Sequence, residues 1–459
     1  MPVVIDGALI AEAAQEVPEV LVVESKSSEE ELGIDDIEQL ADEAEKAEEA
    51  GLYKKAIEIL EQIIAIEKKN FGSEHPEVGG TLSWQASIYI DQALYNKAEP
   101  LLLQGLAISV KALGAKHPET AAQLNNLAFL YDSQGLYSKS EPLYLRALAI
   151  TEKALGPEHP DTATNLNNLA ELYRVQGLYR KAEPLYLRSL EIYEKALGPE
   201  HRHTGISLNN LAGVYNLQGL YGKAEPLYVR SLEIYEKALG PDHRLTAFSL
   251  NNLALLYENQ GLYGKAEPLY QRALAIKEAA LGSEHPSTAS SLNNLAALYD
   301  NQRLYSKAEP LYVRALEINE KALGTEHRQT ATSLNNLALL YERQGQYHKA
   351  EPLVRRGLEI EFMLIQRQAP YLALSDRQSF INSLGLAYEI AFSATTRSKS
   401  GPTLALFVRF NRQGLLEEIE KRQVQLASLP GPQQEVANEL SGLTQQLASM
   451  SLSSEQRQN

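Results

Sequence analysis

The sequence predicts an all-α protein, a long array of antiparallel helix pairs, and three recurring sets of residues support this prediction. Gly-Leu-Tyr and its variants recur with a 42-residue step between residues 51 and 347. A histidine keeps the same step from His75 to His327, and Leu-Asn-Asn-Leu-Ala does so from Leu124 to Leu334. Three patterns that keep one period over this length indicate repeated structural units.

One unit, residues 159–200, shows why each repeat should be two helices. Pro160 suits the first turn of a helix, and apolar residues then recur at helical spacing until Gly177. A second amphipathic stretch follows, from about residue 179 to 197, and Gly198 ends it. Each unit therefore predicts two antiparallel helices joined by a short turn.

The period also predicts three regions. A single helix pair cannot bury its apolar face, so stacked pairs should form a solenoid, with eight pairs over residues 34–366. Residues 1–33 form an acidic lead-in expected to be disordered. Residues 367–459 lack the period and are expected to be helical with a polar tail, and the predicted helices are 376–393, 403–429 and 433–450.

Motifs within the unit resemble a known family. Leu-Asn-Asn-Leu-Ala-x-Leu-Tyr, Tyr-x-Lys-Ala-Glu-Pro-Leu-Tyr and Ala-Leu-Gly-x-x-His-Pro resemble tetratricopeptide repeats, and the 42-residue length resembles the kinesin-light-chain type. The resemblance covers residues 34–366. It implies a right-handed superhelix whose first helices line a concave groove, and a scaffold or adaptor that binds an extended peptide or partner segment there.

A second resemblance concerns the C-terminal region. Residues 412–419 are similar to the helical connector that precedes a caspase-like CHAT peptidase in bacterial proteins. Such a peptidase needs a histidine and a cysteine, but the chain has no cysteine and no histidine after His348. An alternative function follows: a regulatory or sensor array of a CHAT-type peptidase system whose catalytic domain is missing from this chain.

Composition excludes several function classes. The net charge is −16, and residues 1–50 hold 16 acids and two lysines, which argues against nucleic-acid binding. No apolar run approaches the roughly 18 residues of a membrane span, and no basic residue precedes the first apolar stretch. We therefore expect a cytoplasmic protein that contacts neither nucleic acid nor membrane.

Catalytic, cofactor and metal sites are not expected either. Phosphate-binding loops, nucleophile elbows and His-Glu-x-x-His motifs do not occur. Histidines one repeat apart should lie at least a helix-packing distance from one another, too far to share a metal ion. We interpret the histidine column as helix-entry or loop-packing residues, and we expect a non-enzyme without cofactors.

The asparagines suggest a binding face. On a helical wheel, the first asparagine of each Asn-Asn lies beside the implied groove, and the second lies nearer the packed side, where it should bond a neighbouring repeat. The candidate groove residues are Asn125, Asn167, Asn209, Asn251, Asn293, Asn335, Glu171, Arg174, Glu258 and Asp300. Acids outnumber bases beside this column, so we expect a protein or peptide ligand with some basic residues. Self-association through residues 403–450 stays open.

Overall fold

A computed structural model describes residues 33–368, in which a short 3-10 helix, η1 (Ile34–Asp36), precedes eight helix pairs. The chain divides into two compact units, Met1–Ser333 (unit 1) and Leu334–Asn459 (unit 2), and the division falls within α16. The lead-in predicted over residues 1–33 lies outside the described residues, except for Gly33. The predicted C-terminal helices and the connector-like residues 412–419 lie outside them too.

The first helices of the second to eighth pairs begin at the histidine column. At α8 the ring Nδ1 of His159 accepts a hydrogen bond from the Asp161 backbone N–H at 3.2 Å, and the same N-cap recurs at the other histidines of the column. The structure thus confirms the helix-entry interpretation of these residues. The first helices are α2 (Ile37–Glu49), α4 (Pro76–Asp91), α6 (Pro118–Ser133), α8 (Pro160–Val175), α10 (Arg202–Leu217), α12 (Arg244–Asn259), α14 (Pro286–Asn301) and α16 (Arg328–Arg343).

The second helices begin at the tyrosine of Gly-Leu-Tyr. The turn before them needs a left-handed residue, which Gly177 supplies with φ 71°. Two turns lack glycine, and there Ala93 (φ 55°) and Arg303 (φ 60°) adopt the strained conformation. The second helices are α3 (Tyr53–Phe71), α5 (Tyr95–Ala112), α7 (Tyr137–Ala154), α9 (Tyr179–Ala196), α11 (Tyr221–Ala238), α13 (Tyr263–Leu281), α15 (Tyr305–Ala322) and α17 (Tyr347–Gln368).

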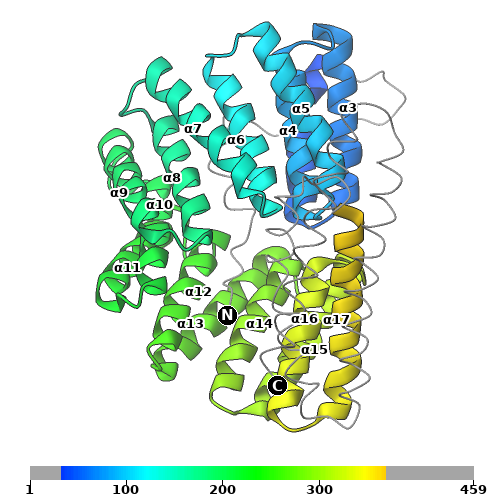
Figure 1. Cartoon of the computed structure of the whole chain (residues 1–459), viewed down its shortest axis with the longest axis vertical. Helices are drawn as coiled ribbons and strands as arrows, with labels where there is room; N and C mark the ends of the chain where they lie inside the picture. Colours follow the sequence, from blue (N-terminus) through cyan, green and yellow to red (C-terminus); the bar gives the residue numbers. More distant parts are fainter. Residues whose placement is uncertain (1–32, 369–459) are drawn as a thin grey trace, which may run out of the picture. The chain divides into compact units, whose positions relative to one another are not determined.

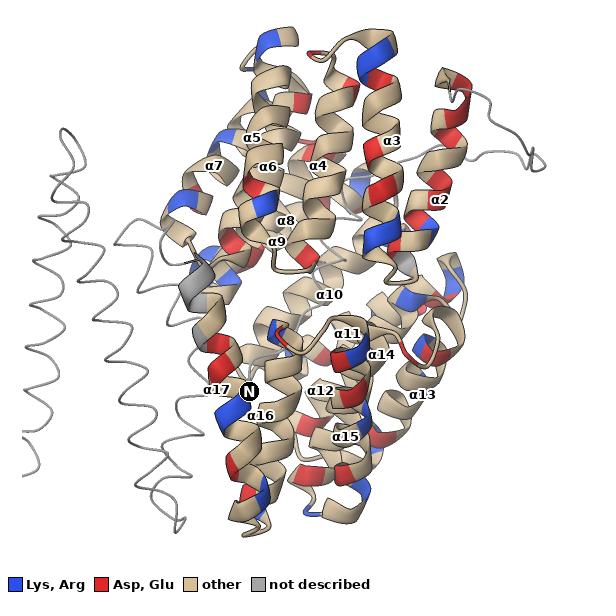
Figure 2. Cartoon of the chain, turned by 90° about the vertical axis from the view of Figure 1, so that its right-hand side faces the viewer, with Lys and Arg blue, Asp and Glu red and all other residues tan. Residues whose placement is uncertain are grey.

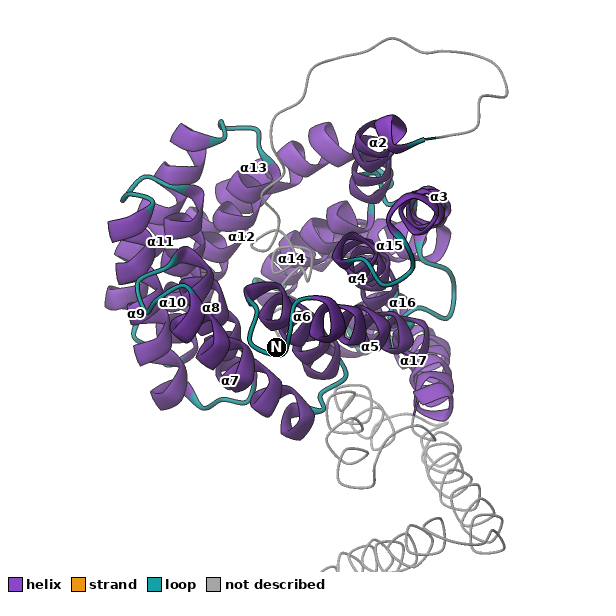
Figure 3. Ribbon diagram, turned by 90° about the horizontal axis from the view of Figure 1, so that it is seen from above, coloured by secondary structure: helices purple, strands orange, loops and turns teal. Residues whose placement is uncertain are grey.

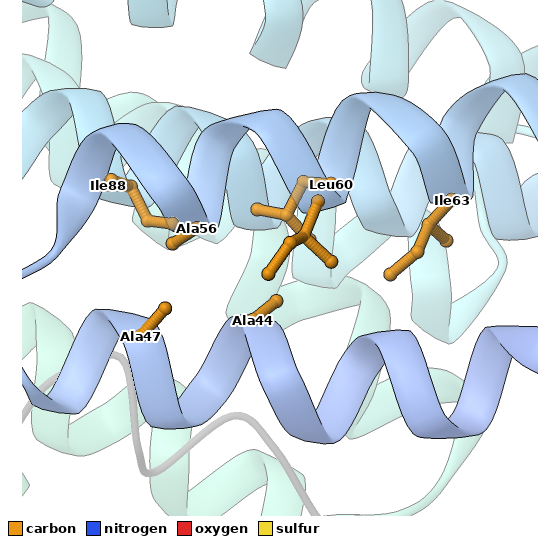
Figure 4. Close-up of a cluster of buried hydrophobic side chains, with 7 residues drawn as sticks. Ala44, Ala47, Ala56, Leu60, Ile63 and Ile88 are labelled. Atoms are coloured by element: carbon orange, nitrogen blue, oxygen red, sulfur yellow. The ribbon is translucent and has the colours of Figure 1, made fainter. Parts of the chain in front are cut away.

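The core is a series of small clusters of buried residues along the stack. In the first pair, Ala44 and Ala47 of α2 face Ala56 and Leu60 of α3, as Figure 4 shows. Each helix of unit 1 packs mainly against the one before and the one after it, so consecutive pairs follow one another along the array (Figure 1). The described residues contain no strand, and the predicted all-α array of antiparallel pairs is confirmed.

Neighbouring pairs are tied together by a repeated polar contact. The Tyr173 hydroxyl of α8 donates to Glu141 of α7 at 2.6 Å, and Lys181 lies 4.6 Å from the centre of the Tyr173 ring. The same tyrosine–glutamate bond recurs at the equivalent positions of α6, α10, α12 and α14. The tyrosine column at the end of the first helix therefore links neighbouring pairs through its hydroxyls, while each ring contacts a lysine of its own pair.

Unit 1 also contains contacts between pairs that are far apart in sequence. Gly51, in the turn between α2 and α3, lies against the ring of His285, the N-cap of α14; a Cβ at Gly51 would be 3.3 Å from that ring. The Arg328 guanidinium hydrogen-bonds the Tyr95 hydroxyl at the start of α5. Both contacts join a turn within one pair to a loop that lies six pairs further along the chain.

Candidate functional site

The first helices lie on the inner side of unit 1. Neighbouring first helices contact one another directly, α4 with α6 and α8 with α10 and so on to α14, whereas successive second helices approach one another less closely. Figure 3 shows the same arrangement, with α9 and α11 outside α8 and α10. A curved stack brings its inner elements together, so the inner side of unit 1 belongs to the first helices.

Four positions of each first helix form the surface on this side, and we call them the inner row. On α10 they are Ile206, Asn210, Gly213 and Leu217, which are half-exposed or exposed and are spaced as one helical stripe. The equivalent positions of the neighbouring helices are also half-exposed or exposed, except Asn168 and Glu171, which are buried. The inner row is therefore the solvent-facing part of the candidate groove.

The first asparagine of each repeat is buried, contrary to our expectation that it faces the groove. Its relative exposure is 8% or less in five repeats, and only Asn293 is half-buried. The second asparagine is half-exposed in five repeats, and only Asn168 is buried. The helical wheel placed the centre of the core correctly but underestimated the width of the buried arc, because each first helix is flanked by other first helices as well as by second helices.

The two asparagine columns are linked by hydrogen bonds. In two places the second asparagine donates to the first asparagine of the preceding repeat: Asn210 to Asn167 at 3.3 Å and Asn252 to Asn209 at 3.2 Å. The expected bond from the second asparagine to a neighbouring repeat is thus present. Two first asparagines, Asn251 and Asn293, donate instead to serines of the next repeat. Four amides of the first column, those of Asn167, Asn209, Asn251 and Asn293, therefore join repeats.

Glu171 and Arg174 form a buried pair on α8. The guanidinium donates to both carboxylate oxygens, at 2.7 and 2.5 Å, and the Tyr186 hydroxyl donates to Glu171 at 2.7 Å. Burial would raise the pKa of Glu171, but the Arg174 charge and these hydrogen bonds more than offset burial and hold that pKa below its usual value. The two predicted site residues therefore neutralise each other.

Other acids near the inner row lie in different surroundings. The Glu258 carboxylate accepts hydrogen bonds from Tyr270 (2.8 Å) and Asn301 (2.7 Å), and burial raises its pKa. Burial and the neighbouring Glu171 raise the pKa of Asp132 to about 8, although Arg174 opposes them. Asp300, which holds the same helix position as Glu258, is buried.

Tyrosines of two second helices bond the side chain at this position of the first helix. Tyr270 lies 12 residues after Glu258 and bonds it, and Tyr228 lies 12 residues after Asn216 and bonds that side chain. These hydrogen bonds between tyrosines and the first helices were not predicted from the sequence. A constant 12-residue offset between the two columns was the signal that could have done so.

Sequence reasoning also missed the apolar part of the inner row. Val175 and Leu217, the last residues of α8 and α10, lie in the inner row and are 43% and 41% exposed. Phe248 and Leu255 of α12 are half-exposed in the same row. The inner surface is therefore a row of amides with apolar neighbours, and the acids lie along one side of it.

Charges on the rest of unit 1 are largely paired between neighbouring repeats. Arg188 lies 2.7 Å from Glu152, and the equivalent pairs recur at three further interfaces. Figure 2 shows acids and bases interspersed along these helices, with acids predominating on α2. Within residues 33–368, no cluster of three or more potential metal ligands occurs.

Comparison with known families identifies the array. A tetratricopeptide repeat model matches six overlapping stretches, residues 77–153, 123–195, 161–237, 203–279, 249–321 and 287–360, which together span more than half of the chain. The chain belongs to the tetratricopeptide repeat family. None of the matched stretches includes a catalytic domain.

The chain is also similar to several solved structures. A kinesin-light-chain-type protein of Podosopora anserina with nearly identical TPR-like repeats is 28% identical over 45% of this chain and 97% of its own, with a TM-score of 0.38. BtubC (BKLC) of P. vanneervenii is 22% identical over 54% and 92%, with a TM-score of 0.41. A Rap protein in complex with competence and sporulation factor is 15% identical over 78% and 99%, with a TM-score of 0.42.

Two further comparisons complete this description. No curated protein matches the sequence of the tetratricopeptide chain. Within the part of the chain that the structure describes, none of the helices combines the length and the apolar character that crossing a membrane requires.

Proposed function

We propose that this tetratricopeptide array is a binding scaffold that holds an extended segment of a partner protein along the inner row of unit 1. The half-exposed second asparagines carry the proposal, because four repeats of unit 1 each present one such amide to solvent. A primary amide both donates and accepts hydrogen bonds, so it can pair with a peptide main chain whatever the side chains are. The amides are Asn126, Asn210, Asn252 and Asn294.

This proposal moves the ligand contacts from the first asparagine column to the second. A side chain that is 3% exposed, such as Asn209, offers a ligand almost no accessible atom. Asn210 uses one of its two amide hydrogens in the bond to Asn167, and its other polar groups stay available at the surface. The first column supports the second, and the second faces the ligand.

The acids beside the row favour a ligand with some lysine or arginine. Glu258 lies next to the row on α12, and the donors that bond it, a tyrosine hydroxyl and an amide, are both neutral. A cation of the ligand beside this carboxylate would stabilise its charged form, which burial alone disfavours. Arg174 does not weaken this preference because Glu171 neutralises it.

Within the family, we place the chain with the kinesin-light-chain type. The 42-residue period and the Leu-Asn-Asn-Leu-Ala motif support this placement. The proposed activity is binding alone, and we expect no hydrolase or transferase activity to track with a point substitution in this chain.

A triple variant tests the proposal. A random 12-residue peptide library selected on the full chain supplies a binder, and calorimetry measures its affinity. Replacing Asn210, Asn252 and Asn294 with alanine should weaken binding tenfold or more, since each lost hydrogen bond contributes about 0.5–1.5 kcal/mol. A binder whose affinity survives that replacement would refute the role of the second column, and failure to select any binder would refute the scaffold function.

A further inference from the structure

Helix contacts in unit 1 form a closed circle. Each helix from α2 to α15 packs against the next one, and the α2–α3 turn then meets the start of α14, which belongs to the seventh pair. The path can be followed in Figure 1, from α3 past α9 and α11 and back to α14. Because the first helices lie on the inner side, the circle surrounds the inner row.

The N-cap histidines show where the circle closes. His285 is buried, and the other six histidines of the column are half-exposed. Pro286 is buried too, whereas the equivalent Pro160 is half-exposed. A Cβ at Gly51 would lie 3.3 Å from the His285 ring and 3.7 Å from Pro286. The α2–α3 turn therefore covers the start of α14.

A second contact lies one pair further along and shows the same contrast. Tyr95 is buried, and the seven other tyrosines that begin second helices are half-exposed. Its hydroxyl donates to the Ser133 carbonyl at 3.2 Å and also hydrogen-bonds the Arg328 guanidinium at the start of α16. The ring of His327 faces the backbone of Asp91 in the same region. The start of α16 thus covers the α4–α5 turn.

These two contacts are small beside the interfaces that build the array. Consecutive helices pack against one another as whole elements, whereas here a turn meets a helix start through ring contacts and a side-chain hydrogen bond. Repeat arrays are held together by interfaces between neighbouring units. The two contacts can therefore separate while every pair stays packed against its neighbours.

We propose that the two contacts form a clasp that closes unit 1 around its inner row, and that the clasp must part to admit a partner segment flanked by folded domains on both sides. This inference rests on the proposed scaffold function and adds a condition on its ligand. A segment with a free end can enter the circle end first. A segment between two folded domains has no free end, so it reaches the inner row only sideways, through the parted clasp.

The clasp should act on the rate of association. Binding that requires a conformational change is slower than binding that does not, because only the open molecules can accept the ligand. A terminal segment avoids this delay. Weakening the clasp should therefore speed the association of an internal segment and leave that of a terminal segment unchanged.

One peptide in three presentations tests the inference on the full chain. The peptide is a 12-residue binder from the library whose affinity depends on Asn210, Asn252 and Asn294. It is fused through its N-terminus to a folded domain, fused through its C-terminus to that domain, or placed between two such domains with flexible linkers. Stopped-flow fluorescence measures the association rates. The two terminal forms should associate at similar rates, and the internal form about tenfold more slowly.

Variants with matched controls show whether the clasp causes the delay. Gly51→Leu pushes a side chain against the His285 ring, and Gly177→Leu has the same left-handed φ (69° and 71°) with nothing within 4 Å of the Cβ. Arg328→Ala removes the second contact, and Arg202→Ala is its control at the equivalent position of α10. The double clasp variant should bind the internal form within about twofold of the terminal forms. The double control should keep the wild-type delay.

Thermal melting checks that the variants fold, and Arg328→Ala against Arg202→Ala repeats the comparison if Gly51→Leu melts well below Gly177→Leu. Equal association rates of the three presentations with wild type would overturn the clasp and leave the scaffold function standing. A delay that persists in the folded clasp variant would do the same. A library without any binder that depends on the second asparagines would overturn both proposals.

Discussion

Helices α8 and α10 occupy equivalent places in consecutive repeats and differ in what they present on the inner side. On α8, Glu171 and Arg174 form an ion pair that is largely buried. On α10, the same two positions hold Gly213, which has no side chain, and Asn216, which has a neutral amide. The residues that stack the repeats are shared by both helices. The comparison shows that recognition can change from repeat to repeat without changing the packing.

The largest expected effect breaks the ion pair of α8. Arg174→Ala leaves Glu171 buried beside Tyr186 without its counter-charge, so unfolding in urea should show a loss of about 3–5 kcal/mol. Asn216→Ala removes only neutral hydrogen bonds at the same helix position and should cost about 1 kcal/mol. Replacing Glu171 and Arg174 together with glutamine should recover most of the loss. Equal costs for Arg174→Ala and Asn216→Ala would contradict the contrast between the two helices.

The second effect concerns the first turns of these two helices, where only α10 has a histidine that makes the free energy of unfolding depend on pH. His203 of α10 stands where α8 has the exposed Asp161, and it packs against the Tyr193 ring with centroids 5.3 Å apart. Burial, with the nearby Arg202 and His201, lowers the pKa of His203 from 6.5 to about 4. Between these values the unfolded chain binds a proton that the folded chain does not, so the free energy of unfolding falls as pH drops from about 6.5 to about 4.

The loss attributed to His203 should reach about 3 kcal/mol by pH 4. Denaturation midpoints of wild type and His203→Asn at pH 7.5 and pH 5 measure it. The variant should show a smaller change between the two pH values, because His327, whose pKa burial also lowers to about 4, remains. If both proteins lose the same stability, His203 does not titrate as described.

A third effect compares the two asparagine columns through stability. Replacing Asn209, Asn251 and Asn293 with alanine removes largely buried bonds to neighbouring repeats and should lower the free energy of unfolding by about 2–3 kcal/mol. Replacing Asn210, Asn252 and Asn294 should lower it by less, since water can reach these half-exposed amides. The reverse order of stabilities would restore the original assignment of the two faces.

The smallest effect uses two glycines of one helix. Gly205→Ala places a Cβ 2.9 Å from Tyr235 and should destabilise the protein by about 1–2 kcal/mol, because the ring must shift. Gly213→Ala has room and should stabilise it by up to about 1 kcal/mol. Thermal unfolding of the two variants measures the difference. If Gly213→Ala lost as much stability as Gly205→Ala, the surroundings of Gly213 would be more tightly packed than the 3.5 Å distance to Tyr228 indicates.

Much of this fold could be predicted because each repeat contains local signals for where its helices begin and end. Pro160, Gly177 and the apolar spacing between them mark the limits of a helix without reference to other repeats. The inner surface could not be predicted in the same way. Whether Asn209 or Asn210 is buried depends on how closely successive first helices approach, and that distance follows from the curvature of the whole stack.

The tyrosines show the same limit. That Tyr270 would be buried follows from its helical spacing, but its bond to Glu258 depends on how the two helices of the pair are rotated about their axes. Gly213 looks unremarkable in the sequence, since many glycines occur. Whether a side chain would fit at Gly213 or at Gly205 depends on the neighbouring helix, which the sequence around each glycine does not specify.

The contacts between Gly51 and His285, and between Tyr95 and Arg328, have a consequence for how such a chain can evolve. Repeat arrays ordinarily lengthen or shorten by duplication or loss of a unit, because each unit touches only its neighbours. Here the sixth unit along the chain is also a neighbour. Insertion or deletion of one unit between the partners would bring the wrong loop to each turn, so the count of repeats between them is itself under constraint.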